Sequence, residues 1–98
     1  MSRHEFSPRA RRELYEIIDY ISERSPAGAR RVRLAIDRAL EVVARNPSLG
    51  HRREDLTDRP LRFWTVMGRF TIIYRGDQPP IEVVHVVGPG RDITRLLS

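Results

Sequence analysis

Cysteine and lysine are both absent from this 98-residue chain, and tryptophan occurs only once. Without cysteine, neither a disulfide framework nor a thiolate metal site can form. Without lysine there is no amine of tunable pKa to act as a base, because arginine stays protonated and serves as a charge and a hydrogen-bond donor. No apolar run is long enough to span a membrane, and the N-terminal residues lack the apolar core of a signal peptide. We therefore expect a soluble cytoplasmic protein that uses no cofactor.

Length and charge restrict the architecture and the partners. A hydrophobic content of 40% over this length is sufficient for one domain, residues 1–98, with a single modest core. The net charge of +5 favours a polyanionic or acidic partner. Genomic base composition alone would produce the same excess of arginine, so the charge does not identify the partner.

Two stretches have apolar residues at helical spacing and begin with a capping pair. Ser7-Pro8 opens the first helix, expected to end near Arg24, and Ser25-Pro26 opens the second, which ends at Asn46-Pro47. The apolar stripes consist of Leu14, Ile17, Ile18 and Ile21, and of Ala29, Val32, Ile36, Ala39, Leu40 and Val43. The very short connection predicts an antiparallel αα-hairpin. Three acidic residues are assigned to the solvated face of the first helix, without a histidine near them to complete a metal site: Glu13, Glu16 and Asp19.

Three later apolar runs predict a meander of strands over residues 61–66, 69–75 and 81–87. The last of these is apolar on both faces, as expected of a central strand. A short extended segment, residues 3–6, precedes the first helix. The overall prediction is an α+β fold with the order β-α-α-β-β-β, in which the αα-hairpin covers one face of a mainly antiparallel sheet.

The remaining segments contain no regular pattern. Residues 46–59 combine turn chemistry with a charged run and predict a surface loop held down by Leu49 and Leu56. The glycines around Pro89 end the sheet, and residues 91–97 form a basic tail with about one helical turn.

Alternation along the strands assigns side chains to two faces of the sheet. The face toward the helices is expected to carry Phe63, Phe70, Ile72 and Tyr74. The uncovered face is then expected to present Trp64, with the other members of this face being Arg62, Val66, Arg69, Thr71, Ile73 and Arg75. If the first strand has the opposite orientation, Trp64 belongs to the core.

Four features occur in an order that resembles the RelE/ParE family of bacterial toxins. They are the Ser7-Pro8 start of the first helix, the Asn46-Pro47-Ser48-Leu49-Gly50 loop, the strand from Gly68 to Arg75, and the ending Gly88-Pro89-Gly90-Arg91-Asp92-Ile93. The resemblance covers nearly the whole chain. It implies the toxin of a type II toxin–antitoxin pair, which arrests growth and is silenced when the C-terminal segment of an antitoxin wraps around it.

The two branches of this family differ in their chemistry. RelE-like members cleave mRNA on the ribosome and place cations where this chain has Trp64 and Thr71, and they have a tyrosine or histidine in a tail that here has neither. Such cleavage needs an activated nucleophile and neutralisation of the phosphorane charge. The Asn-Pro-x-x-Gly loop and the Gly-x-Gly-Arg-Asp-Ile ending look more like the ParE branch, known from plasmid stabilization. That branch implies a DNA gyrase inhibitor that is not an enzyme, neutralised by a ParD-like antitoxin.

Candidate functional residues follow from these two alternatives. For binding an antitoxin or a target we predict Trp64, Val66, Arg69, Ile73, Arg75, Arg91 and Arg95, because tryptophan and arginine dominate binding hot spots. For the alternative, a RelE-like endoribonuclease, the available residues are Arg62, Arg69, Arg75, His85 and Arg91. His85 has no evident carboxylate partner in the sequence, which favours a packed residue over a general base. We expect no membrane association and no sequence-specific DNA binding by this chain alone.

Overall fold

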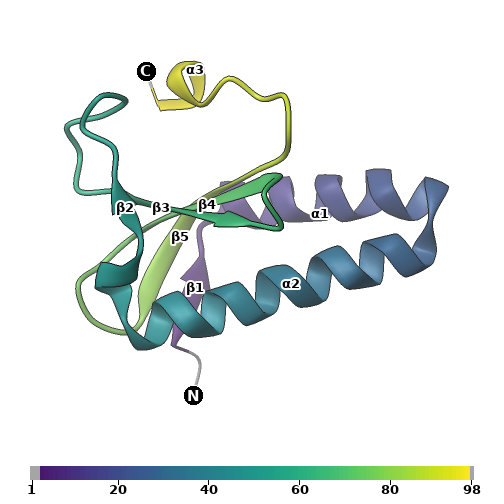
Figure 1. Cartoon of the computed structure of the whole chain (residues 1–98), viewed down its shortest axis with the longest axis horizontal. Helices are drawn as coiled ribbons and strands as arrows, with labels where there is room; N and C mark the ends of the chain where they lie inside the picture. Colours follow the sequence, from purple (N-terminus) through teal and green to yellow (C-terminus); the bar gives the residue numbers. More distant parts are fainter. Residues whose placement is uncertain (1–2, 98) are drawn as a thin grey trace.

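The computed structural model describes residues 3–97, which form a five-stranded sheet, two long helices and a short C-terminal helix (Figure 1). The elements are β1 (His4–Phe6), α1 (Pro8–Arg24), α2 (Pro26–Arg45), a 3-10 turn (Pro47–Leu49), β2 (His51–Arg52), β3 (Arg62–Val66), β4 (Phe70–Arg75), β5 (Ile81–Val87) and α3 (Ile93–Leu97). The strands lie in the order β1-β5-β4-β3-β2, with β1 parallel to β5 and the other pairs antiparallel. The predicted α+β order is confirmed. None of the helices in this part of the chain is long and apolar enough to cross a membrane.

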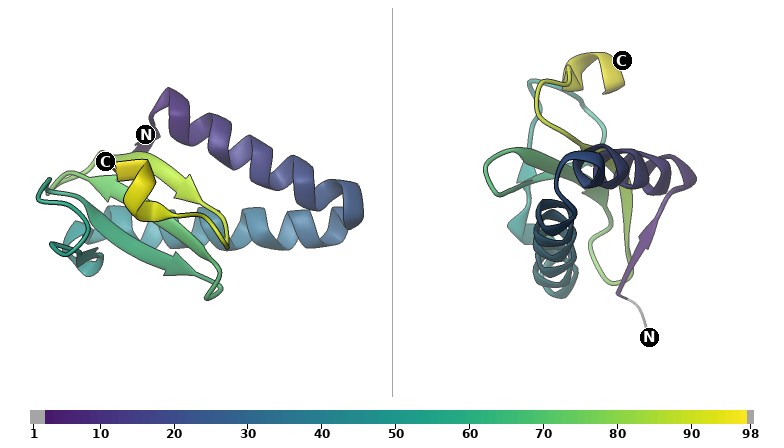
Figure 2. Two further views of the ribbon diagram at one scale, coloured as in Figure 1. Left: turned by 90° about the horizontal axis from the view of Figure 1, so that it is seen from above. Right: turned by 90° about the vertical axis from the view of Figure 1, so that its right-hand side faces the viewer.

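Both long helices begin where the capping pairs predict. The Ser7 hydroxyl accepts a hydrogen bond from the Ala10 N–H at 3.0 Å, and the Ser25 hydroxyl accepts one from the Gly28 N–H at 3.0 Å. Because Ser25 has extended backbone angles, it ends α1 and caps α2 at once. The helices therefore run antiparallel beside each other (Figure 2).

The main core lies between the αα-hairpin and one face of the sheet. It contains Leu14 from α1, three α2 residues and the alternating β4 set predicted to face the helices: Ile36, Leu40, Val43, Phe70, Ile72 and Tyr74. The prediction for this face of β4 is confirmed.

The face assignment of β3 is wrong. Trp64 pairs with Ile72, and Phe63 pairs with Ile73. Since directly opposed residues of an antiparallel pair share a face, Trp64 and Val66 lie on the helix side and Phe63 on the other. Both faces of β3 carry a large aromatic residue, so alternation alone could not orient the strand.

The second face of the sheet is covered and not open. Leu61, Phe63 and Ile73 form a smaller cluster with Val87 and with Leu97 of α3. Figures 1 and 2 show α3 on the side of the sheet opposite to α2. Ile73 is consequently buried, which corrects its prediction as an exposed residue.

The loop after α2 also differs in part from the prediction. Leu56 packs against the second cluster as expected, but Leu49 is 40% exposed. His51 and Arg52 pair with β3 as a two-residue edge strand, which is too short and too polar to be recognised as a strand in the sequence.

The turn between β3 and β4 gives the first testable prediction. Met67 has a φ of 56°, in the left-handed region that costs a non-glycine residue about 1 kcal/mol, and its side chain is 53% exposed. We expect Met67→Asn to raise the free energy of unfolding by about 0.5–1 kcal/mol, because asparagine adopts this conformation more readily. Urea denaturation measures the change. Met67→Leu is the matched control, and a Leu variant as stable as the Asn variant would contradict the explanation.

Candidate partner-binding site

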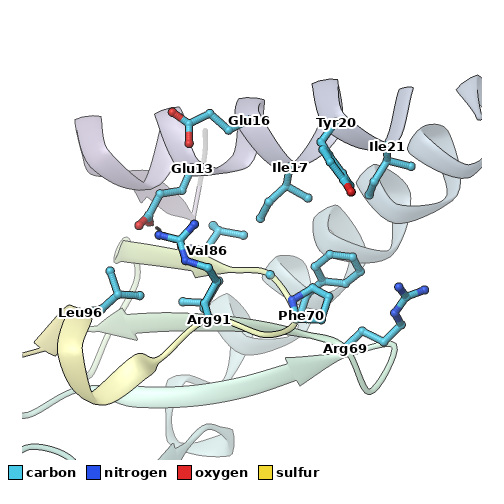
Figure 3. Close-up of a pocket in the computed structure, with 13 residues that line it drawn as sticks. Glu13, Glu16, Ile17, Tyr20, Ile21, Arg69, Phe70, Val86, Arg91 and Leu96 are labelled. Atoms are coloured by element: carbon cyan, nitrogen blue, oxygen red, sulfur yellow. Dashed lines mark hydrogen bonds between the residues drawn. The ribbon is translucent and has the colours of Figure 1, made fainter. Parts of the chain in front are cut away.

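A pocket of about 590 Å³ opens between α1 and the segment that follows β5 (Figure 3). Its lining consists of Glu13, Glu16, Ile17, Tyr20, Ile21, Arg69, Phe70, Val86, Val87, Gly88, Pro89, Arg91 and Leu96. Most of these side chains are apolar, whereas the charged ones are two acids from α1 and two arginines from the opposite side. The pocket is thus an apolar depression with charged groups around it.

The pocket follows from the periodicity of α1 and from the end of the sheet. Glu13, Ile17 and Ile21 succeed one another at intervals of four residues, so they lie along one side of the helix. Gly88 faces this row, since a Cβ there would lie 3.8 Å from the Ile17 side chain. Tyr20 is 60% exposed while lining the pocket, and it provides an aromatic surface that a partner can cover.

Two arginines mark separate ends of the pocket. Figure 3 shows Arg91 extending from the C-terminal segment toward the α1 side near Glu13, while Arg69 lies beyond the Phe70 ring at the other end. The Arg69 guanidinium carbon is 5.9 Å from the centre of that ring. A bound segment would therefore meet an arginine at each end, with Glu13 beside Arg91, and apolar surface between them.

Glu13 is not on the solvated face, and this prediction is wrong. Its carboxylate accepts a hydrogen bond from the Val86 N–H at 3.1 Å and lies 3.3 Å from His85 Nδ1. The Glu13 and His85 side chains are 15% and 11% exposed. The parallel strand β1 ends at Phe6, opposite Val83, so it does not extend as far as Val86. The Glu13 carboxylate accepts the hydrogen bond of the Val86 N–H that a longer neighbouring strand would otherwise accept. His85 therefore does have a carboxylate partner, 72 residues away in the chain.

The structure separates the residues predicted to bind a partner. Arg69 and Arg91 line the pocket, whereas Arg95 and Arg91 line a neighbouring one. Arg75 is exposed and pairs with Glu82 at 2.6 Å.

Two apolar candidates lie away from the pocket. Val66 is buried in the main core, and Trp64 packs partly against that core. The Trp64 ring also stacks on His51 with 6.4 Å between ring centres. These contacts match the alternative in which Trp64 belongs to the core.

The five residues considered for RNA cleavage do not form one constellation. Arg62 donates to the carbonyl of Gly50 at 2.9 Å and so holds the loop after α2. His85 contacts Glu13 without lining the pocket, and Arg75 pairs with Glu82. Of the five, all within the described part of the chain, Arg69 and Arg91 alone line the same pocket.

The Asn-Pro-x-x-Gly loop is fastened by a buried tyrosine that sequence reasoning assigned only to the core. The Tyr74 hydroxyl donates to the Pro47 carbonyl at 2.6 Å and accepts from the Gly50 N–H at 2.9 Å. Both ends of the loop therefore bind one side chain from β4. Nothing local in the sequence connects Tyr74 to a loop 24 residues earlier. The spacing of the Asn-Pro-x-x-Gly motif was the only sign in the sequence that the conformation of this loop is restricted.

This tyrosine predicts a loss of stability at alkaline pH. Burial raises the pKa of Tyr74 above its ordinary value of 10.0, while the Gly50 hydrogen bond and the Arg62 charge act in the opposite direction. A phenol whose pKa is higher in the folded state stabilises the fold below its unfolded pKa, and this contribution disappears as the pH rises through the folded pKa. We expect the free energy of unfolding to fall as the pH rises above about 10, the unfolded pKa, and to fall less in Tyr74→Phe. Urea titrations at several pH values test this, and parallel curves for the two proteins would contradict it.

Metal binding finds no support in the geometry. Across residues 3–97, no three histidine, aspartate or glutamate side chains are grouped closely enough to hold a metal ion.

The fold agrees with one class of protein. An αα-hairpin on a meander of strands is the arrangement that the resemblance implies, that of the small toxins of type II toxin–antitoxin systems. The family model of the ParE toxin of the type II toxin-antitoxin system, parDE, matches residues 4–93, and the chain belongs to this family. The protein is thus a ParE-type toxin, which implies an antitoxin partner.

Solved structures give the same fold. The chain is similar to a structure described as "Chromosomal ParDE TA system from P. aeruginosa", with a TM-score of 0.70 and 16% sequence identity. The alignment covers 91% of this chain and 97% of the other. No curated protein sequence matches the chain.

Proposed function

We propose that this ParE-type toxin acts by binding and inhibiting DNA gyrase, and that a ParD-like antitoxin neutralises it by occupying the pocket between α1 and the C-terminal segment. Membership of the ParE family supports both parts, and the similar structure is itself described as a ParDE system. The observation that carries the proposal is the pocket itself. It combines an exposed aromatic ring, Tyr20, with an apolar floor and with charge at two separate ends.

The chemistry of the pocket indicates what the antitoxin presents there. Ile17, Ile21 and Phe70 favour bulky apolar side chains, because burial of apolar area supplies most of the stabilisation in such a contact. Arg69 and Arg91 favour acidic residues before and after these apolar side chains in the antitoxin segment, since an arginine forms paired hydrogen bonds with a carboxylate. An antitoxin segment with apolar anchors flanked by acids would fit.

Inhibition by binding agrees better with the side chains than catalysis does. The Glu13 and His85 pair is largely buried and its carboxylate also accepts the Val86 N–H, so it is occupied in holding α1 to β5. Arg62 is likewise occupied by the loop after α2. A general base must be within reach of the proton that it removes, and His85 is not part of the pocket lining.

Supercoiling assays test the target. Purified toxin is added to DNA gyrase, with and without its antitoxin. In a parallel experiment, the toxin is added to translating ribosomes, and their mRNA is then sequenced. We expect loss of supercoiling that the antitoxin restores, and intact mRNA. Ribosome-dependent cleavage together with unimpaired gyrase would overturn the proposal in favour of an endoribonuclease.

A histidine variant separates the two mechanisms further. His85→Gln keeps a hydrogen-bonding group beside Glu13 and removes the titratable ring. We expect gyrase inhibition to change less than about threefold, because surface binding depends on the pocket and not on proton transfer. A loss of growth arrest by two orders of magnitude in a variant with an unchanged thermal midpoint would indicate catalysis instead.

A further inference from the structure

A second pocket, of about 460 Å³, lies beside the first and has a different character. Its lining consists of Arg9, Gly90, Arg91, Asp92, Arg95 and Leu96. Three arginines and one aspartate thus belong to the lining, and Glu13 lies next to it, 3.5 Å from Arg9. Asp92 is already engaged in part, since its Oδ1 accepts a hydrogen bond from the Arg95 backbone N–H at 3.3 Å.

The start of α1 adds to this excess of positive charge. The first turn of α1 contains no acidic residue, although the positive end of the helix dipole favours a negative neighbour there. Arg9 stands in this turn instead. Within residues 3–97 its only ion pair is a long one, 3.5 Å to Glu13, and the Arg9 side chain is 59% exposed. Because the Arg9 side chain is mostly exposed, water screens this pair in part and the guanidinium remains accessible to a ligand.

We propose that this second pocket binds a phosphate group. A carboxylate has two oxygens and is satisfied by a single arginine fork, whereas a phosphate offers more acceptor oxygens and is bound by several guanidinium groups at once. The pocket is also larger than one carboxylate requires, and Leu96 gives it an apolar wall against which a sugar or a base can lie. The phosphate can come from a free anion or from a nucleic-acid backbone. The inference does not depend on gyrase being the target.

The chain brings these groups together from opposite ends. Arg9 follows the cap of α1, and the other lining residues belong to the segment after β5, where Gly90 has a φ of 81°. This left-handed turn favours glycine and has no atom within 4 Å of the position that a Cβ would take. Arg91 and Leu96 line both pockets, so a phosphate in the second pocket would lie directly beside a segment bound in the first.

Side-chain NMR of the full chain tests the proposal. The arginine Nε–Hε signals of the toxin are followed during titration with inorganic phosphate, with a single-stranded DNA octamer, and with an acidic peptide of equal charge. We expect the signals of Arg9, Arg91 and Arg95 to shift together with the two phosphate-bearing ligands. Tighter binding of the DNA than of inorganic phosphate would identify a nucleic-acid backbone as the source, and equal binding a free anion.

Three variants make the result specific. Arg91→Gln and Arg95→Gln are each expected to weaken binding about tenfold, the usual effect of losing one charged phosphate contact. Arg31→Gln removes the same charge from an exposed site on α2 and is the matched control, with an expected change below about twofold. Equal weakening by Arg31→Gln, tighter binding of the acidic peptide than of DNA, or the absence of a concerted shift would each overturn the proposal.

Discussion

Replacing Gly50 with alanine is expected to lower the free energy of unfolding by about 3 kcal/mol, because the new methyl group would overlap the Tyr74 hydroxyl. The Gly50 backbone has a φ of −66°, which any residue adopts, so the requirement for glycine here is one of space. The ring carbons of Tyr74 are also close, with Cε1 and Cζ each 2.8 Å from the position of the added Cβ. Relief would require moving the hydroxyl away from both Pro47 and Gly50, which would leave buried polar groups unpaired.

Urea denaturation of Gly50→Ala provides the measurement, and Gly88→Ala is its control. A Cβ at Gly88 would meet Ile17 at an ordinary contact distance of 3.8 Å, so we expect a change within about 0.5 kcal/mol. The two variants carry the same chemical change and differ only in the space available. Equal stability of the two would show that the Tyr74 contact does not restrict residue 50.

Placing a charge in the first pocket is expected to abolish silencing of the toxin. Ile17→Asp puts a carboxylate among apolar side chains that the proposed antitoxin segment must cover, and we expect its affinity to fall at least about a hundredfold. Titration calorimetry measures this directly. In cells, co-expressed antitoxin would no longer relieve growth arrest.

Two further variants distinguish a loss of antitoxin binding from a failure of Ile17→Asp to fold. Arg69→Glu reverses the charge of an exposed residue at the other end of the pocket and is expected to weaken antitoxin binding by at least about tenfold without altering the core. Tyr15→Asp introduces a carboxylate at an exposed position of α1 that is outside the pocket lining. Full affinity in Ile17→Asp and Arg69→Glu, or equal losses in Tyr15→Asp, would place the antitoxin elsewhere.

Much of the candidate site was visible in the sequence only as separate parts. Arg69 and Arg91 were predicted as binding residues, and both line the first pocket. Ile17 and Ile21 were predicted as core residues, and they pack partly against the core while also forming the pocket floor. The place of Tyr20 in the pocket lining was not predicted, because an exposed tyrosine on a solvated helix face has no local signal that distinguishes it.

The sequence by itself determined both long helices with their starting residues and four of the five strands, but not the two-residue strand β2. Ser7, Ser25 and the glycines that follow β3, β4 and β5 act within a few residues of themselves, so their effects can be inferred without knowledge of the fold. The family was likewise indicated by short motifs in a fixed order, and the match over residues 4–93 confirms it.

Only the tertiary structure decided which face of β3 meets the helices and which side chains converge. The orientation of Trp64 depends on the register between β3 and β4, in which a shift of one residue would exchange the two faces. The contacts of Glu13 with His85 and of Tyr74 with Gly50 join residues 72 and 24 positions apart, and no local pattern encodes them. The pockets share this origin, since they are lined by α1 and by the C-terminal segment, which are far apart in the sequence and become neighbours only in the fold.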